Sequence, residues 1–213
     1  MRQDEVICKP SQESGSGRNI EFWKTAEMKQ HINDFLHNNN NTNYLVQKIL
    51  TQHEELARIH AESINTIRTC SILMSDGVHI LSSVLRMGVE HSRVDNATAG
   101  GITCGINPDG TLQEFAYSYY SGKKYIKHPQ GYIFKGKTVP SYEKIIQLIK
   151  EAHQLLGNFR LVSWDIAVDQ NGEPVLIEAN MRKGSINFHQ FSNGPMFGEL
   201  TDQVLNEVFN KKE

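Results

Sequence analysis

The feature that most constrains the fold is a hairpin pattern in the C-terminal part of the sequence. Two apolar runs, Phe159 to Val168 and Pro174 to Ala179, flank the turn segment 169–172, whose last two residues are Asn-Gly. Asn-Gly between two such runs is typical of a tight β-turn, because both residues tolerate the positive φ angles that the turn requires. The pattern predicts two antiparallel strands, and therefore a sheet that is at least partly antiparallel.

Three oxygen-bearing side chains interrupt these apolar strands. Counting back from the turn brings Asp165 on the first strand level with Glu178 and Asn180 on the second. Residues two apart on a strand point to the same face, so the three side chains could converge. Carboxylate and amide oxygens suit Mg²⁺, which proteins bind through a few such ligands together with phosphate oxygens and water. The alternative is a surface hairpin whose acids point into water, since Asp and Glu are mostly exposed.

A second informative segment lies at the start of the sequence. Residues 6–8 predict a short strand that ends at Lys9-Pro10, and a Gly/Ser-rich loop follows up to Gly17. Backbone N–H groups of such a loop can surround phosphate oxygens, and a lysine at the strand end adds positive charge. The segment lacks the Gly-Lys-Ser/Thr of a P-loop. A flexible hairpin loop without a ligand would have the same composition.

The rest of the chain alternates strands and helices. Further strands are expected over 19–23, 44–50, 66–73, 78–87 and 101–117, and helices over 25–36, 53–60, 142–156 and 199–209. The clearest helix is 142–156, where Ile145, Ile149 and Ala152 share one side. Residues 121–140 predict an irregular basic loop. Strands outnumber helices, which favours an α+β fold with a mostly antiparallel sheet.

Composition excludes several function classes. The 213 residues include 22 Lys or Arg and 24 Asp or Glu, a formal net charge of −2, which argues against electrostatically driven binding to nucleic acid. No apolar run approaches the ~20 residues of a membrane span, and we expect no signal peptide. Three distant cysteines (Cys8, Cys70 and Cys104) argue against a disulfide framework or a structural zinc site and favour a reducing cytoplasm.

The N-terminal loop and the carboxylate hairpin together resemble the ATP-grasp superfamily of ATP-dependent ligases. Lys9 and the loop up to Gly17 are similar to the family's second ATP-binding lysine and its glycine-rich flap. Residues 44–54 (YLVQKILTQHE) are similar to its adenine hinge. Asp165, Glu178 thirteen residues later and Asn180 match the family's spacing of magnesium ligands.

Several shorter phrases resemble the sugar-transfer-associated ATP-grasp group, which is associated with bacterial capsule and surface-polysaccharide gene clusters. These phrases are Ser63 to Arg68, Val94 to Asn96 with Gly100 to Ile102, His128 to Gly131, Val162 to Asp165 and Glu178 to Asn180.

The resemblance implies a set of site residues. The ligands of Mg²⁺, or of Mn²⁺ in its place, would be Asp165, Glu178 and Asn180. ATP would contact Lys9, Ser14, Gly15, Ser16, Gly17, Gln47, Lys48, Ile49, Leu50 and Glu54. Arg68 and Arg182 would be catalytic: Arg68 would bind the transferring phosphoryl group or the acyl phosphate, and Arg182 would bind phosphate or the substrate carboxylate. Lys127, His128 and Lys183 would contact the substrate.

The resemblance also implies an ATP-grasp fold of two subdomains. Residues 1–50 would form part of the lid subdomain with the phosphate flap and hinge, and residues 51–213 the C-terminal subdomain with the metal site.

The sequence departs from the family's usual pattern at two places. Ser163 stands where many ATP-grasp ligases have an arginine, and Arg68 could supply that cation from a neighbouring strand. The sequence also begins just before the strand of Lys9, so we expect it to lack the family's usual N-terminal α/β domain.

The implied function is ATP- and Mg²⁺-dependent ligation of a carboxylate to an amine or thiol through an acyl phosphate, in bacterial surface-polysaccharide or sugar-transfer metabolism. The partners would be small-molecule or glycan-linked carboxylates and amines. A bare sheet edge makes a homo-oligomer plausible. Two alternatives stay open. One is a non-catalytic ATP-binding module or fragment of a larger ligase. The other is a carbohydrate-binding module built on the aromatic residues of 117–134.

Overall fold

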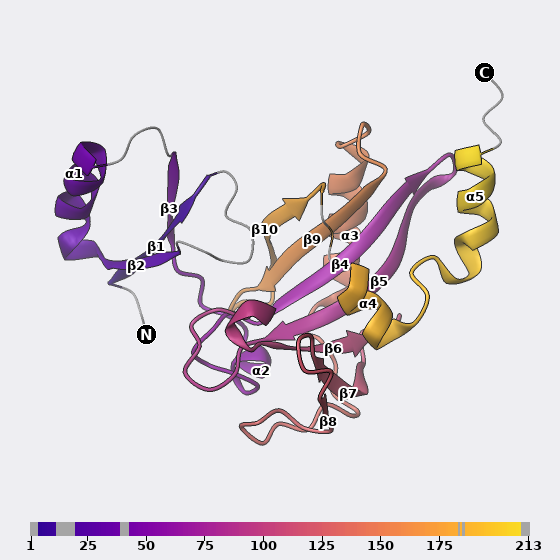
Figure 1. The fold of residues 1–213 in the computed structure, drawn as a ribbon, viewed down its shortest axis with the longest axis horizontal. Coiled ribbons are helices and arrows are strands. Elements are labelled where there is room, and N and C mark those ends of the chain that lie inside the picture. Colours follow the sequence, from indigo (N-terminus) through magenta and orange to yellow (C-terminus); the bar gives the residue numbers. More distant parts are fainter. Residues whose placement is uncertain (1–3, 12–19, 39–42, 183, 185, 210–213) are drawn as a thin grey trace. The chain divides into compact units, whose positions relative to one another are not determined.

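The computed structural model describes residues 4–11, 20–38, 43–182, 184 and 186–209. The chain folds into two compact units, Met1–Thr51 and Gln52–Glu213, each with its own sheet (Figure 1). The division falls one residue after the boundary that the sequence suggests.

Unit 1 is a three-stranded antiparallel sheet with one helix. The strands are β1 (Glu5–Pro10), β2 (Glu21–Lys24) and β3 (Tyr44–Lys48), in the order β2-β1-β3, and the helix is α1 (Met28–Asn38). Helix α1 packs on the face that carries Trp23, because the Trp23 and His31 rings stack with their centroids 5.0 Å apart. Cys8 is fully buried on this same face, and burial together with the charge of Glu21 raises the pKa of its thiol.

Unit 2 is built on a seven-stranded antiparallel sheet in the order β10-β9-β4-β5-β6-β7-β8. Its strands are β4 (Thr66–Met74), β5 (Gly77–Met87), β6 (Ile102–Ile106), β7 (Leu112–Ser118), β8 (Lys124–Tyr125), β9 (Leu161–Val168) and β10 (Pro174–Asn180). The predicted hairpin is therefore present as β9 and β10. The expected α+β class with a mostly antiparallel sheet is confirmed.

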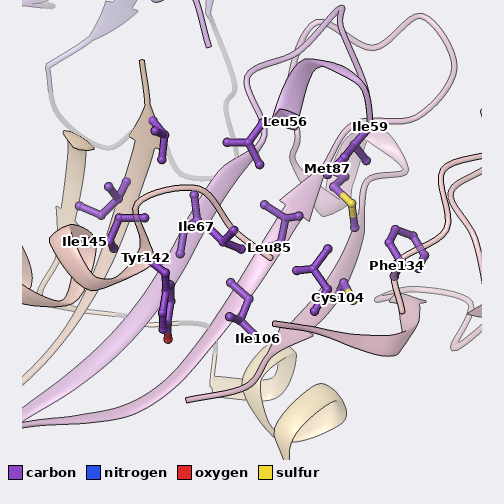
Figure 2. Close-up of a cluster of buried hydrophobic side chains, with 14 of the residues drawn as sticks. Leu56, Ile59, Ile67, Leu85, Met87, Cys104, Ile106, Phe134, Tyr142 and Ile145 are labelled. Atoms are coloured by element: carbon purple, nitrogen blue, oxygen red, sulfur yellow. The ribbon is translucent and has the colours of Figure 1, made fainter. Parts of the chain in front are cut away.

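One face of this sheet forms the core. Ile67, Leu85 and Cys104 lie opposite one another on β4, β5 and β6, and all three are buried. Helix α3 (Tyr142–Gln154) covers this face through Tyr142, Ile145 and Ile149. Figure 2 shows the resulting cluster, which the short helix α2 (Glu54–Ala57) extends with Leu56. The apolar stripe read from the sequence of 142–156 is thus the core side of α3.

Two further helices follow β10. Helix α4 (Ile186–Asn193) packs on β5, β6 and β7 (Figure 1). Helix α5 (Thr201–Phe209) places Val204 in a small cluster with Ile72 and Met74. Glu207 holds α5 to the sheet by pairing with Arg160 and accepting from the backbone N–H of Ser75 at 2.9 Å.

The structure differs from the sequence predictions in four elements. Helix α4 was not expected. The strand expected over 44–50 ends at Lys48, the helix expected over 53–60 is confined to Glu54–Ala57, and the basic segment 121–140 contains the two-residue strand β8. Within the described residues, no helix combines the length and apolar character needed to cross a membrane.

Candidate functional site

A row of polar side chains crosses the sheet face opposite the core. Glu178 on β10 lies directly across from Asp165 on β9, and Asp165 lies directly across from Arg68 on β4. Residues paired in this way project to the same face. The neighbouring core-face residue Trp164 points the other way, as its alternation along the strand predicts. The prediction that Asp165 and Glu178 lie near the same level on the two strands is therefore confirmed, and a β-bulge between Leu176 and Glu178 produces their pairing. Asn180 lies two pairs further along, across from Ser163, and therefore projects to the same face.

Asp165 is held by two arginines. Arg68 donates from Nε to Oδ1 at 2.6 Å and from Nη2 to Oδ2 at 2.5 Å, and Arg86 on β5 donates from Nη1 to Oδ2 at 3.1 Å. Asp165 is only 5 % exposed. Burial alone would raise the pKa of this carboxyl, but the charges and hydrogen bonds of Arg86 and Arg68 outweigh it and keep the pKa below its usual range. Asp165 is therefore a charged, buried carboxylate.

Arg86 connects this pair to a loop that follows β5. Its Nη2 donates to Asp95 Oδ1 at 3.1 Å and also to Asn96 Oδ1. Sequence reasoning did not single out Arg86. The available signal was one charged residue in a strand that otherwise reads as largely apolar, since buried arginines are rare unless they are paired.

Glu178 and Asn180 are less constrained than Asp165. The Glu178 side chain is exposed. Burial would lower the pKa of Arg68, but the hydrogen bond and charge of Asp165, together with the charges of Asp95 and Glu178, outweigh burial and raise that pKa. In the part of the chain that the structure describes, the buried amide nitrogen of Asn180 has no hydrogen-bond partner. An Asn amide can present its oxygen at the same place after a half-turn.

The donor set fits a divalent cation that prefers oxygen. Glu178 and Asn180 are open to a ligand, and Asp165 Oδ1 accepts only one hydrogen bond from the described residues, which leaves it one acceptor position. Among the described residues, no group of three His, Cys, Asp or Glu side chains could by itself hold a metal. A magnesium ion here would use two carboxylates and one amide, and would depend on phosphate oxygens and water for the rest.

Helix α4 closes the same face with polar side chains. His189 is fully buried, and its Nδ1 lies 2.9 Å from Ser82 Oγ on β5. Burial and the charge of Arg68 lower the pKa of His189 to about 4, so the ring is neutral at physiological pH. Gly105 on β6 lets α4 approach, since a Cβ there would lie 2.3 Å from Asn193 Oδ1.

The residues predicted to contact ATP fall in three groups. Lys9 lies across from Leu45, and Gln47 lies across from Ile7, so Lys9 and Gln47 share the face of the unit 1 sheet that does not carry α1. Lys48 projects to the α1 face, and Ile49 and Leu50 follow the end of β3. Glu54 is exposed at the start of α2 in unit 2. The predicted flap residues Ser14, Gly15, Ser16 and Gly17 lie outside the described residues.

The predicted catalytic Arg182 and the predicted substrate residues also differ in how exposed they are. Arg182 and Lys127 are exposed, and Lys183 lies outside the described residues. His128 is fully buried, with Nε2 donating to the Gly88 carbonyl at 2.8 Å and Nδ1 accepting from the Gln130 N–H at 3.2 Å. The prediction that His128 contacts the substrate does not agree with this geometry, because both ring nitrogens are used to hold the backbone.

Comparison with solved structures shows the fold. D-alanyl-alanine synthetase A from Vibrio cholerae is 14 % identical with a TM-score of 0.53, over 98 % of this chain and 52 % of that one. The ATP-grasp ligase PsnB, solved with a minimal precursor, is 14 % identical with a TM-score of 0.53, over 96 % of this chain and 49 % of that one. The L-amino acid ligase from Bacillus licheniformis is 12 % identical with a TM-score of 0.49, over 96 % of this chain and 39 % of that one.

The chain thus spans about half, or less, of the length of these structures. No curated protein matches it in sequence. The sequence model of one family, described as sugar-transfer associated ATP-grasp, matches residues 4–206. This match covers nearly the whole chain, and the chain belongs to the sugar-transfer associated ATP-grasp family.

Proposed function

We propose that this protein is, or is part of, an ATP- and Mg²⁺-dependent ligase that joins a carboxylate to an amine or thiol through an acyl phosphate, with release of ADP. The proposal is carried by one observation. In a chain of the ATP-grasp family, Asp165, Glu178 and Asn180 project from one face of a sheet on which two arginines also converge. The family's description supports an association with sugar transfer. We extend the proposal to surface-polysaccharide or sugar-transfer metabolism in the cytoplasm, with glycan-linked or small carboxylate and amine substrates.

Each residue of this face has a defined part in the proposal. Glu178, Asn180 and Asp165 Oδ1 would hold Mg²⁺, or Mn²⁺ in its place. Magnesium-ATP, when bound, supplies the phosphoryl group that activates the carboxylate. Arg68 would bind the phosphoryl oxygens, because its guanidinium group keeps its proton and its positive charge while it holds Asp165. Removing one such electrostatic contact typically costs about 3 kcal/mol of the barrier.

The remaining predicted contacts stay proposals of the same kind. Lys9 would neutralise phosphate charge, the backbone of residues 48–50 with Gln47 would meet the adenine, and Glu54 would meet the ribose hydroxyls. Arg182, which is exposed between β10 and α4, would bind phosphate or the substrate carboxylate. Lys127 and Lys183 would contact the substrate. We do not extend this role to His128, which is buried.

Calorimetric titration of ATP with and without Mg²⁺ tests the proposal. The wild-type protein should bind ATP more tightly with Mg²⁺. Glu178→Gln keeps the size of the side chain and removes its charge, so it should weaken the magnesium-dependent part of ATP affinity at least about tenfold, or ~1.4 kcal/mol. Glu143→Gln is the matched control, because Glu143 is also exposed but lies on α3 at the opposite face. Equal magnesium dependence in wild type and Glu178→Gln would remove the metal assignment.

A second candidate, a module that binds ATP without turning it over, is favoured by one observation. Both oxygens of Asp165 are already engaged by arginines, so its charge is balanced without a metal. Measuring ADP after incubation with Mg²⁺-ATP and mixtures of candidate carboxylates and amines separates the two. Release of ADP that requires both a carboxylate and an amine supports the ligase. Tight ATP binding without ADP release across such mixtures supports the module.

A further inference from the structure

We propose that Asp95 and Asn96 are positioning residues that hold Arg86 and, through Arg86, keep one side of the Asp165 carboxylate open for a metal ion. The inference rests on the proposed function, because only there is Asp165 a metal ligand. It assigns a role to a loop, residues 88–101, that leads from β5 to β6 and is not otherwise used in the proposed chemistry.

The loop engages one nitrogen of the Arg86 guanidinium group completely. Nη2 of Arg86 carries two hydrogens, and both are used: one is donated to Asp95 Oδ1 at 3.1 Å and the other to Asn96 Oδ1. The side chains of Arg86 and Asp95 are 7 % and 11 % exposed, so water competes little with these contacts. Arg86 can therefore offer Asp165 only its remaining hydrogens, and it gives one bond, from Nη1 to Oδ2 at 3.1 Å.

The second step is the effect on Asp165. Its Oδ2 accepts from both arginines, whereas Oδ1 accepts, among the described residues, only from Arg68 Nε. A carboxylate oxygen has two acceptor positions, so Oδ1 keeps one. If the loop released Arg86, the guanidinium could turn its fork toward Asp165 and occupy that position too, because arginine binds carboxylates with two parallel bonds.

The third step is charge. Two arginines face three carboxylates here, those of Asp95, Asp165 and Glu178, so one negative charge is left to attract a cation. Neutralising Asp95 would remove this surplus negative charge next to Asp165 in a poorly solvated place. A divalent cation would then be attracted less strongly, and the low local dielectric enlarges this effect. Geometry and charge therefore predict the same result: without Asp95, Asp165 binds a metal less well.

The loop is built to hold this conformation. The Asn96 carbonyl accepts from the N–H of Ala99 and of Gly101 at 3.0 and 3.1 Å. Gly101 cannot be replaced easily, because a Cβ there would lie 2.5 Å from the Asp95 carbonyl oxygen. Asp95 is also tied to β4, since its Oδ2 accepts from the backbone N–H of Thr66 at 3.2 Å and from the Thr66 hydroxyl.

The start of the loop is fixed by two buried histidines. His128 Nε2 lies 2.8 Å from the Gly88 carbonyl, and His60 Nε2 lies 3.0 Å from the Glu90 carbonyl. Gly88 itself leaves no room for a side chain, since a Cβ would lie 2.5 Å from Ser63 Oγ. A plain connecting turn would not need these contacts. They indicate that the positions of Asp95 and Asn96 are strictly set.

The experiment measures how much Mg²⁺ is needed for ATP binding. Calorimetric ATP titrations over a series of Mg²⁺ concentrations are compared for wild type, Asp95→Asn and Asn96→Ala. We expect Asp95→Asn to raise the half-effective Mg²⁺ concentration about tenfold and Asn96→Ala about threefold, while ATP affinity without Mg²⁺ is kept or increased. A merely structural defect would weaken both.

Asp109→Asn is the matched control. Asp109 pins its own loop as Asp95 does, by accepting from the backbone N–H and hydroxyl of a threonine, Thr111, at 2.9 and 2.6 Å. Among the described residues, Asp109 bonds to Thr111 and to no arginine, so its substitution should leave the Mg²⁺ requirement within twofold of wild type. A folded Asp95→Asn protein with the wild-type requirement would overturn the inference alone. Wild-type ATP binding that does not depend on Mg²⁺ would overturn the proposed function, and the inference with it.

A double-mutant cycle gives a readout without metal or ATP. Unfolding free energies are measured for Asp95→Asn, Asp165→Asn and the double variant. Because the two acids share Arg86, the double variant should lose more stability than the sum of the single losses, as Arg86 is then left without either acid. Additive losses would mean that Asp95 acts only through Thr66, and would overturn the inference even if Asp95→Asn altered Mg²⁺ binding.

Discussion

At the scale of single residues, Asp165 is a buried carboxylate whose charge balances two arginines. It is nearly inaccessible to water and receives hydrogen bonds from two guanidinium groups. Replacing it with Asn leaves Arg68 and Arg86 close together without their shared counter-charge. We expect Asp165→Asn to destabilise the protein by about 3–5 kcal/mol at pH 7, the usual cost of leaving a buried charge unpaired. Urea unfolding measures this. Asp76→Asn is the control, because its ion pair with His79 is exposed and screened by solvent.

The carboxyl of Asp165 also makes the free energy of unfolding depend on pH under acidic conditions. The pKa of Asp165 is lower in the folded protein than its ordinary value of about 3.9. Its stabilisation is therefore fully present above the unfolded-state pKa and is lost as the pH falls through the lower folded-state pKa. The difference in unfolding free energy between wild type and Asp165→Asn should shrink below about pH 4. A difference that stayed constant from neutral pH into acid would show that charge is not its source.

His189 gives a second pH dependence at a higher pH. Its pKa falls from about 6.5 in the unfolded chain to about 4 in the fold, chiefly through burial and then through the charge of Arg68. The neutral ring therefore stabilises the fold fully above pH 6.5, and this stabilisation is lost as the pH falls toward 4. Between these values wild type should lose up to about 3 kcal/mol that His189→Gln does not lose. Urea unfolding at several pH values checks this, and parallel profiles for the two proteins would contradict it.

Among the secondary-structure elements, α4 depends on one glycine. The Asn193 side chain donates to the Ser83 carbonyl at 2.8 Å and accepts from Gln113 at 2.7 Å directly over Gly105. Gly105→Ala should displace these side chains and cost about 1–3 kcal/mol, the usual effect of overpacking. Gly157→Ala should be neutral or slightly stabilising, since a Cβ there has no atom within 4 Å. Equal unfolding free energies for the two variants would show that α4 tolerates the shift.

Helix α4 also shows why some elements could not be read from the sequence. The apolar stripe of α3 predicted its core side, because that helix packs on an apolar face. Helix α4 packs on a polar face, so the side chain that it buries is His189, beside the half-buried Asn193, while Phe191 is 57 % exposed. The hydrophobic periodicity of α4 therefore carries no signal for its contact side. The polar contacts of His189 and Asn193 that fix this side emerge only from the fold.

The site, like the helices, has some features that the sequence predicts and others that depend on the complete fold. Pairing outward from the turn follows from the local sequence, but a β-bulge between Leu176 and Glu178 shifts the register by one residue and brings Glu178 across from Asp165, which the position of the turn alone does not predict. The contact of Asp165 with Arg86 depends on the order of β9, β4 and β5, which joins residues far apart in the sequence. His128 was expected in a solvated basic loop. Its burial results from packing against Gly88 and His60, which no local pattern indicates.

At the scale of the whole molecule, the two units carry very different cores. Among the described residues of unit 1, the fully or nearly buried apolar side chains are Cys8 and Trp23, whereas unit 2 buries an extended cluster between its sheet and α3. Small units bury a smaller fraction of their surface, so their folded state has less hydrophobic stabilisation. We therefore expect unit 1 to unfold at a lower urea concentration than unit 2.

The sequence provides a reporter for each unit, because its two tryptophans are Trp23 in unit 1 and Trp164 in unit 2. Trp164→Phe leaves Trp23 as the only fluorophore of its kind, and it alters only unit 2, where it removes the indole hydrogen bond to Ser71 at 2.7 Å. Trp23→Phe leaves Trp164 and alters only unit 1. Each reporter thus remains in an unaltered unit. Both variants are followed by fluorescence at equal protein concentration. The Trp23 fluorescence of Trp164→Phe should change at a lower urea concentration than the Trp164 fluorescence of Trp23→Phe. Coincident transitions in the two variants would mean that the units unfold as one cooperative body, and that the small core of unit 1 does not set its stability.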